Sequence, residues 1–183
     1  DECFKYLSEK PLACASVAQV HEAVLYDGRQ VVVKFQRPEI DEKMKMDISI
    51  LKRIIKFTNT RINIGIVDPL DVLDEIEKTT VKELDFINEG RNILKFSENN
   101  KEVNSICAPK IITEIWSKKI LILEKIDGFK ITDLKKLKNE GYEPKDVANK
   151  LALSYCKQVF EDGFFHGDPH PGNLFIYNNR ICF

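Results

Sequence analysis

The stretch that decides the fold is His166-Gly167-Asp168-Pro169-His170-Pro171-Gly172-Asn173. In it Asp168 and Asn173 lie five residues apart, on a loop that two prolines are expected to stiffen. Phosphoryl transfer needs a carboxylate to orient or deprotonate the attacking hydroxyl and an amide oxygen to ligate Mg²⁺. The stretch therefore predicts a catalytic loop in which Asp168 acts on the acceptor and Asn173 binds the metal.

Two other interpretations of this loop stay open at this point. It could be a turn rich in proline and glycine whose polar side chains are merely solvated. Alternatively, His166, Asp168 and His170 could hold a transition metal, although Pro169 and Pro171 break the strand pairing that would put them on one face.

The composition is that of an ordinary globular chain. Of its 183 residues, 43% are hydrophobic and 31% charged, which excludes disorder and collagen-like repeats. A net charge of -1 predicts no nucleic-acid partner. Five cysteines without a CxxC pair favour a reducing compartment over a disulfide framework or a structural zinc site. No apolar run approaches the ~20 residues that span a bilayer, and the start and end of the chain suggest a piece of a longer protein.

Hairpins and helices alternate along the chain. We predict, in order, a hairpin over residues 17–26 and 30–36, a helix over 40–55, helical structure from 68 to about 96, a strand pair over 110–116 and 119–125, helices over 133–141 and 147–159, and a hairpin over 174–177 and 180–183. Asp68-Pro69 is a helix start, and Thr79-Thr80-Val81 could divide the helix that follows. This order predicts an α+β fold.

Lys34 lies in the apolar segment Val31-Val32-Val33, where an ammonium group must reach solvent or find an anion. It is either an edge-strand charge or a group that pairs with phosphate oxygens and a helix carboxylate. Glu83, Asp85 and Glu89 supply carboxylates, and on a continuous helix Asp85 and Glu89 would share a face. These carboxylates could form a solvated acidic stripe. Alternatively, Glu89 could point inward and pair with Lys34.

Small residues gather just before the first predicted hairpin, in Ala13-Cys14-Ala15-Ser16. Small side chains let a backbone approach a phosphate closely, as glycines do in other nucleotide-binding loops. The same segment could instead be a tightly packed part of the core.

Five segments in one order resemble the UbiB family, also called the AarF or ADCK family, of atypical protein-kinase-like proteins. They are PLACASVAQVHEA from residue 11, VVVKFQRPEI from 31, KELDFINEGRN from 82, LILEKIDG from 121 and FFHGDPHPGNLF from 164. The resemblance implies a two-lobed kinase-like fold that binds ATP with Mg²⁺. Residues 1–126 would form an N-lobe with inserted helices, and residues 127–183 part of the C-lobe.

The resemblance also implies roles for individual residues. Lys34 matches the nucleotide-pairing lysine, Glu89 its helix partner, Asp168 the catalytic aspartate and Asn173 the metal-binding asparagine. Ala13, Cys14, Ala15 and Ser16 match the alanine-rich nucleotide loop, and Glu83 and Asp85 match a regulatory acidic motif. Lys125 to Gly128 match the hinge between the lobes, where Glu124, Lys125 and Ile126 are the expected nucleotide-binding residues. Cys14 stands where alanine is usual. A K-x-G-Q segment and a second metal-binding aspartate are absent from these residues. Because that aspartate is missing, this chain alone is expected to be inactive.

The resulting expectation is an ATP-dependent kinase or ATPase that supports isoprenoid quinone or lipid metabolism. The expected partners are ATP, isoprenoid lipids or quinone-biosynthesis enzymes. The membrane would be reached from its cytoplasmic face, through regions outside this chain. Two alternatives stay open: a small-molecule phosphotransferase of the aminoglycoside or choline kinase type, and a nucleotide-binding scaffold without turnover.

Overall fold

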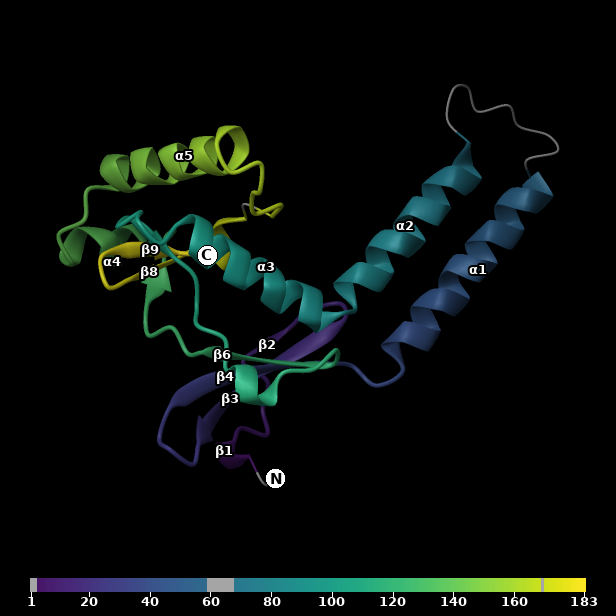
Figure 1. Cartoon of the computed structure of the whole chain (residues 1–183), viewed down its shortest axis with the longest axis horizontal. Coiled ribbons are helices and arrows are strands. Elements are labelled where there is room, and N and C mark those ends of the chain that lie inside the picture. Colours follow the sequence, from purple (N-terminus) through teal and green to yellow (C-terminus); the bar gives the residue numbers. More distant parts are fainter. Residues whose placement is uncertain (1–2, 59–67, 169) are drawn as a thin grey trace. The chain divides into compact units, whose positions relative to one another are not determined.

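The computed structural model describes residues 3–58, 68–168 and 170–183, and the chain forms two compact units (Figure 1). The first unit comprises Asp1–Gly90 with Ile112–Ile122, and the second Arg91–Ile111 with Leu123–Phe183. Each unit has its own sheet and its own hydrophobic core. The lobe boundary between residues 126 and 127 stays a prediction.

The sheet of the first unit has the strand order β1-β3-β4-β6, and β2 pairs with β3. The strands are β1 (Phe4–Leu7), β2 (Ala13–Cys14), β3 (Ala18–Leu25), β4 (Gln30–Gln36) and β6 (Ile120–Glu124). Strands β3 and β4 are antiparallel and form the predicted first hairpin. Its turn contains Gly28 at φ 88°, a left-handed conformation that glycine adopts without strain.

Residues of β3 and β4 alternate between a buried face and a half-exposed face. The buried face belongs to the core cluster of Ala23, Leu25, Val31, Val33, Ile112 and Ile122. The other face presents Val32 and Lys34, and Val20 is the register partner of Lys34 on β3. The strand period therefore places Lys34 opposite the core, beside apolar neighbours.

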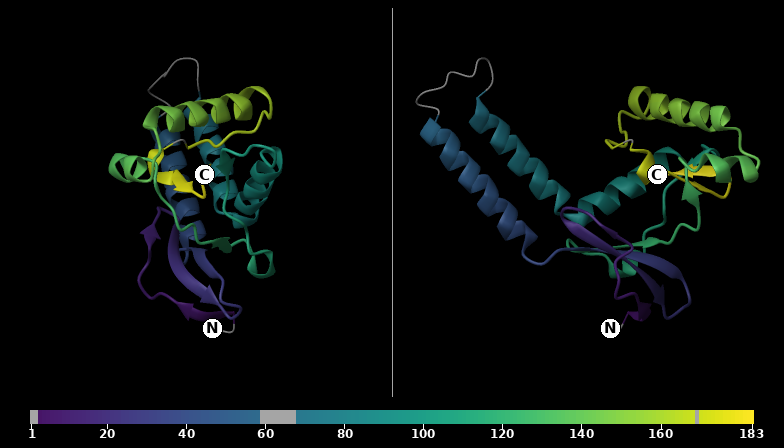
Figure 2. Two further views of the ribbon diagram at one scale, coloured as in Figure 1. Left: turned by 90° about the vertical axis from the view of Figure 1, so that its left-hand side faces the viewer. Right: turned by 180° about the vertical axis from the view of Figure 1, so that it is seen from behind.

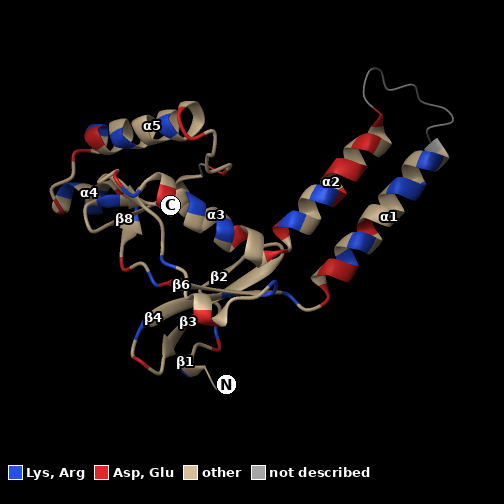
Figure 3. Ribbon diagram, in the orientation of Figure 1, with Lys and Arg blue, Asp and Glu red and all other residues tan. Residues whose placement is uncertain are grey.

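Helices α1 (Ile40–Thr58) and α2 (Pro69–Glu83) lie side by side within the first unit (Figures 1 and 2). Charged residues occur along both helices (Figure 3), and Lys52 on α1 pairs with Asp74 on α2 at 2.7 Å. As predicted, Asp68 caps α2, accepting a hydrogen bond from the backbone N–H of Leu70 at 2.8 Å. In the described residues, no helix combines the length and the hydropathy needed to cross a membrane.

The helical stretch that starts at residue 68 is broken, but not at Thr79-Thr80-Val81. α2 ends at Glu83, and α3 spans Phe86–Asn99. The carboxylate of Asp85 accepts a hydrogen bond from the backbone N–H of Ile87 at 3.0 Å, which satisfies a donor at the start of α3. This N-cap fixes the start of α3, whereas the β-branched run 79–81 disfavours a helix only weakly and stays within α2. The possibility of two helices is therefore confirmed, but the break lies at residues 84–85 and not at the β-branched run.

The sheet of the second unit has the order β5-β9-β8-β7. Its strands are β5 (Ile106–Cys107), β7 (Phe129–Lys130), β8 (Phe175–Tyr177) and β9 (Arg180–Cys182). Strands β8 and β9 form the predicted last hairpin, with Asn178 and Asn179 at φ 48° and 60° in its turn. The predicted helices are also present, as α4 (Leu134–Asn139) and α5 (Pro144–Phe160). The core of this unit consists of Phe96, Ile106, Leu137, Val147, Leu174, Ile176 and Ile181.

The predicted strand pair over residues 110–116 and 119–125 is only half correct. The second segment is β6, but the first contributes one isolated bridge, from Ile111 to Leu123, and then the 3₁₀ helix η1 (Thr113–Ile115). The indole N–H of Trp116 donates to the carbonyl of Phe86 at 3.0 Å. Its ring covers Gly90, where a Cβ would lie 2.3 Å from the indole. This contact with a distant segment draws the chain out of the sheet.

Candidate active site

Lys34 on β4 forms an ion pair with Glu89 in the first turn of α3, as predicted. The Lys34 Nζ lies 2.6 Å from Oε2 and 2.8 Å from Oε1 of Glu89. It also lies 4.8 Å from the centre of the Phe86 ring. The two charged side chains are 24% and 34% exposed, so their attraction is screened less than that of a surface pair. The interpretation of Lys34 as an unpaired edge-strand charge is excluded.

Three hydrogen bonds hold the start of α3 against the sheet and so position Glu89. The backbone N–H of Phe86 donates to the carbonyl of Lys118 at 3.0 Å. The side-chain amide of Gln36 donates to the carbonyl of Leu84. Trp116 donates to the carbonyl of Phe86, as described above. The position of Glu89 is therefore fixed by these three hydrogen bonds of the first unit as well as by its own ion pair.

The small-residue loop also lies near Lys34. Ala13 pairs in register with Val20, which in turn pairs with Lys34, so the three residues form one row across the sheet. The backbone N–H of Ala15 donates to the carbonyl of Ala18 at 2.9 Å and closes the turn between β2 and β3. Residues 13–16 are all exposed, so the alternative of a packed core segment is excluded. An exposed loop of small residues leaves its backbone open to a ligand.

Val20 and Val32, which share the half-exposed face of Lys34, were not predicted as site residues. An apolar surface beside an ammonium group can take the flat face of a nucleobase while the amine meets phosphate oxygens. The signal was present, since the period-2 rule places Val32 on the Lys34 side of β4.

In the second unit, the structure brings together the two residues that define the predicted catalytic loop. The Asn173 side chain donates from Nδ2 to Oδ2 of Asp168 at 2.8 Å. The other oxygen of Asp168 accepts from the backbone N–H of His170 at 3.3 Å. Asp168 and Asn173 are exposed and thus accessible to a substrate. Pro169, one of the two prolines expected to stiffen the loop, lies outside the described residues.

The oxygen atoms of this loop fit Mg²⁺. Because Asn173 uses Nδ2 for the bond to Asp168, its Oδ1 is the amide atom left to ligate a cation. Carboxylate and amide oxygens are the ligands that Mg²⁺ prefers. The alternative of a transition metal fails. Within residues 3–58, 68–168 and 170–183, no three His, Cys, Asp or Glu side chains are arranged to hold a metal. His166 and His170 accept, through Nδ1, from the backbone N–H groups of Asp168 and Gly172.

Gln158 on α5 anchors the start of this loop and was not predicted as a site residue. Its side chain is fully buried. The Oε1 atom accepts from the backbone N–H of His166 at 3.0 Å, and Nε2 donates to the Ser154 hydroxyl at 2.9 Å. A glutamine in the middle of a helix carries no local signal of such a role. Its function depends on where the later loop lies.

Tyr155 on the same helix is a second residue that sequence analysis missed. Its hydroxyl is buried, and in the part of the chain that the structure describes it has no hydrogen-bond partner. Burial raises the pKa of this phenol, and the negative charge of Asp168 raises it further. Tyr155 is therefore held as the neutral phenol near the carboxylate of the loop.

The predicted hinge residues lie at and after the end of β6. The Glu124 carboxylate accepts from the backbone N–H of Lys110 at 3.4 Å and from the Tyr177 hydroxyl at 3.3 Å. The nearby negative charge of Glu124 raises the pKa of the Tyr177 phenol. Lys125 and Ile126 are half-buried. Of the two acids predicted to be regulatory, Glu83 is exposed at the end of α2, and Asp85 caps α3.

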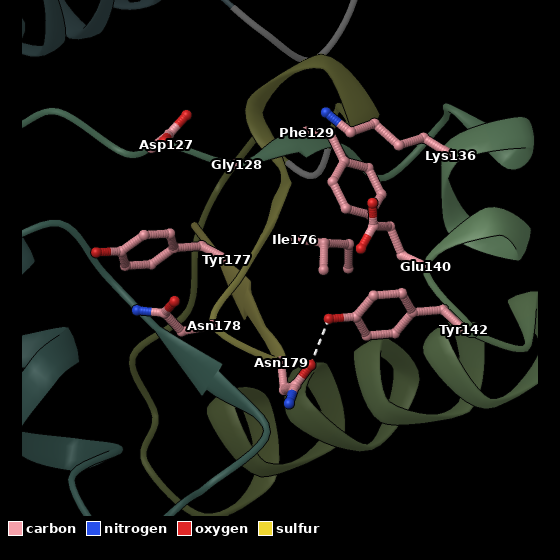
Figure 4. Close-up of a pocket in the computed structure, with 10 residues that line it drawn as sticks. All are labelled: Asp127, Gly128, Phe129, Lys136, Glu140, Tyr142, Ile176, Tyr177, Asn178 and Asn179. Carbon is pink, nitrogen blue, oxygen red and sulfur yellow. Dashed lines mark hydrogen bonds between the residues drawn. The ribbon is translucent and has the colours of Figure 1, made fainter.

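A pocket of about 470 Å³ opens in the second unit beside the hinge segment (Figure 4). It is lined by Asp127, Gly128, Phe129, Lys136, Glu140, Tyr142, Ile176, Tyr177, Asn178 and Asn179. The Tyr142 hydroxyl donates to Asn179 Oδ1 at 2.5 Å across one side of it (Figure 4). Neither Asp168 nor Asn173 lines this pocket, so it is not the predicted catalytic site.

The comparisons with known proteins agree with this geometry. The family described as "ABC1 atypical kinase-like domain" matches residues 1–182. "AarF domain-containing protein kinase 1" of Xenopus tropicalis is 36% identical and covers 97% of this chain. A protein of Clostridium pasteurianum, named for its place in the hydrogenase 1 5′ region, is 51% identical over 100% of this chain. The chain spans 34% of the length of each of these two relatives.

A solved structure supports the fold. The Rv3197 protein of Mycobacterium tuberculosis, determined in complex with erythromycin, has a TM-score of 0.79 and is 28% identical. The match covers 100% of this chain and 46% of that one. The predicted α+β, kinase-like fold class is thereby confirmed. On the family match, the two relatives and this shared fold, the chain belongs to the ABC1 atypical kinase-like family, which includes the AarF proteins that its sequence resembles.

Proposed function

We propose that this chain is the ATP-binding core of an atypical kinase or ATPase that transfers phosphoryl groups from ATP in the presence of Mg²⁺. The observation that carries the proposal is the ion pair between Lys34 and Glu89, at 2.6 Å. An ammonium group has three hydrogens, and two of them are directed at the Glu89 carboxylate. The third is left for a phosphate oxygen, the role of the paired lysine in kinase-like sites.

The nucleotide would also contact the exposed loop of Ala13, Cys14, Ala15 and Ser16. Its base would lie on the apolar face of Val20 and Val32, and the hinge residues Glu124, Lys125 and Ile126 would bind its edge. The assignment of the loop and of Val20 is supported by the register that joins Ala13, Val20 and Lys34 in one row. The assignment of the hinge residues is supported by the resemblance of their segment to the UbiB family. A backbone without bulky side chains lets phosphate oxygens approach N–H groups closely.

Asp168 would orient the acceptor hydroxyl and accept its proton. Its hydrogen bond from Asn173 and its bond from the His170 backbone fix the direction of the carboxylate. Asn173 would hold Mg²⁺ through Oδ1, and the bound cation would offset the charge of the phosphates. Gln158 and Tyr155 would act indirectly, by holding the loop and shielding one side of Asp168.

We further propose that the whole protein acts in isoprenoid quinone or lipid metabolism, at the cytoplasmic face of a membrane and with isoprenoid lipids or quinone-biosynthesis enzymes as partners. The support for this is the resemblance of five separate segments to the UbiB family. The regulatory role of Glu83 and Asp85 rests on the same resemblance.

The decisive experiment compares the full-length protein with its Asp168→Asn variant in ATP binding and in phosphate release. We expect turnover to fall by about 10² to 10⁴, the usual contribution of a general base, while ATP binding is retained. Asp71→Asn, which removes the same charge from an exposed position on α2, should leave both unchanged. Full turnover in Asp168→Asn would contradict the catalytic assignment. Binding without turnover in the wild-type protein would contradict the enzyme assignment and favour a scaffold.

A further inference from the structure

Two of the five cysteines are neighbours on adjacent strands of the second unit. Cys107 on β5 and Cys182 on β9 are register partners in a parallel pair. The backbone bond from Phe183 N–H to the Cys107 carbonyl, at 3.0 Å, closes the ladder beside them. Register partners in a parallel sheet project their side chains from the same face. Strands lie about 4.8 Å apart, within the Cα separation that a disulfide can bridge.

The two thiols differ in their access to solvent. Cys182 is only 2% exposed, whereas Cys107 is half-exposed. A reagent in solution can therefore reach the sulfur of Cys107 before it reaches that of Cys182.

They also differ in acidity. In the structure the Cys182 thiol donates to the Phe183 carbonyl oxygen at 3.9 Å. A hydrogen bond from this thiol to the Cys107 thiolate lowers the pKa of Cys107 to about 7, and Arg180 favours the thiolate as well, against burial and the charge of Glu124. The same hydrogen bond raises the pKa of Cys182, and burial raises it further. Tyr177 is also near this site, because the charge of the Cys107 thiolate raises the pKa of its phenol. Near neutral pH, Cys107 is thus the nucleophile of the pair and Cys182 stays a thiol.

The other three cysteines provide a contrast. Cys3, Cys14 and Cys156 are all exposed and lie at the start of the chain, on β2 and on α5. The exposure of a thiol to solvent alone therefore does not identify a reactive cysteine in this chain. What distinguishes Cys107 is a second thiol held in register beside it.

We propose that Cys107 and Cys182 form a thiol–disulfide exchange site that reacts with small-molecule disulfides of the glutathione type. The Cys107 thiolate attacks one sulfur of the disulfide, which forms a mixed disulfide and releases one thiolate. Cys182 then gives its proton to a thiolate in solution and attacks the Cys107 sulfur, which displaces the second small thiol. In sum, two cysteine thiols are oxidised to one disulfide, and one small disulfide is reduced to two thiols.

The reaction takes place next to the predicted catalytic loop. Phe183 follows Cys182, and its ring centre lies 5.9 Å from that of His166 and 5.8 Å from that of Tyr155. The exchange chemistry itself requires neither ATP nor Asp168. Its test is therefore independent of the proposed kinase function.

The experiment treats the reduced full-length protein with oxidised glutathione and identifies the products by peptide mass spectrometry. In the wild-type protein we expect a peptide pair joined through Cys107 and Cys182. Cys182→Ser should stop at glutathione bound to Cys107, and Cys107→Ser should prevent both products. Cys182→Ala serves as a second variant, because serine would place a hydroxyl in a buried position. Cys156→Ser, at an exposed thiol, should behave as the wild type does.

A pH series of alkylation by iodoacetamide tests the assigned roles. The rate at Cys107 should be half-maximal near pH 7 in the wild type. In Cys182→Ala it should shift toward the value of about 8.5 that is usual for a free cysteine. The proposal is overturned if the wild type stops at the mixed disulfide or if Cys107 links to another cysteine. It is also overturned if removing Cys182 leaves the pH midpoint unchanged.

Discussion

The Lys34 ammonium group and the Glu89 carboxylate, 55 positions apart in the sequence, are joined by two hydrogen bonds of 2.6 and 2.8 Å. Replacing Glu89 by Gln leaves a half-buried ammonium without its counter-charge. We expect a loss of stability between the ~1 kcal/mol of an exposed ion pair and the ~3–5 kcal/mol of a fully buried one. Urea unfolding of the variant measures this loss.

Lys101→Met is the matched control for that measurement. Lys101 pairs with Glu98 at 2.6 Å, but the two side chains are 59% and 70% exposed. We therefore expect a change within about 0.5 kcal/mol. Equal losses in the two variants would show that shielding from water adds nothing to the pair of Lys34 and Glu89.

Gln158→Leu tests the anchor of the catalytic loop. The substitution removes the acceptor for the backbone N–H of His166 and leaves that donor near a buried apolar side chain. The expected loss of stability is about 1–3 kcal/mol, the cost of an unsatisfied buried polar group. Chemical denaturation measures it. Leu153→Ala on the same helix is the control, since Leu153 is 70% exposed. A Gln158→Leu protein as stable as the wild type would remove the anchoring role.

The pairing of α1 with α2 should depend on pH at both ends of the range. The hydrogen bond to Lys52 holds the pKa of the Asp74 carboxyl below its usual 3.8. The contribution of the ionised Asp74 carboxylate to stability is therefore present above that value, and it is lost as the pH falls through the folded pKa. The hydrogen bonds to Asp74 and then Glu77 raise the pKa of Lys52 above 10.5. That contribution is complete below pH 10.5 and is lost as the pH rises through the folded pKa.

A carboxyl-carbon NMR titration of Asp74 checks the acid side. The midpoint should lie below 3.8 in the wild type and should return toward 3.8 in Lys52→Met. Lys43→Met, an exposed lysine on the same helix, should leave it nearly unchanged. An Asp74 midpoint at the ordinary value in the wild type would show that the ion pair does not form in solution.

Local chemistry predicted much of the fold and the two side-chain pairs on which the candidate site rests. A lone ammonium group in an apolar strand required a partner, and Glu89 provides it. Asp168 and Asn173 were predicted to lie together in one loop, because phosphoryl transfer uses a carboxylate and an amide oxygen, and the two side chains are hydrogen-bonded. The Asp68 cap and the Asn178-Asn179 turn were likewise encoded in neighbouring residues.

The parts that were missed depend on contacts between distant segments. Residues 110–116 have the composition of a strand, yet the bond from Trp116 to Phe86 diverts them. Strand β1 has exposed residues at three of its four positions, so it carries no alternating pattern. Gln158 acquires its role only because His166 lies against it after the helix has ended. The spacing of hydrophobic residues along each segment does not indicate any of these relationships.

The central claim, that Lys34 meets the phosphates of a bound nucleotide, is tested most directly by an ATP analogue that carries an activated acyl group on its terminal phosphate. A lysine amine close to the phosphates attacks this acyl carbon and becomes acylated, which peptide mass spectrometry locates. In the full-length protein we predict that Lys34 is acylated faster than the exposed Lys101, and that excess ATP with Mg²⁺ suppresses only the labelling of Lys34. Equal labelling of the two lysines, with no protection by ATP, would contradict the claim.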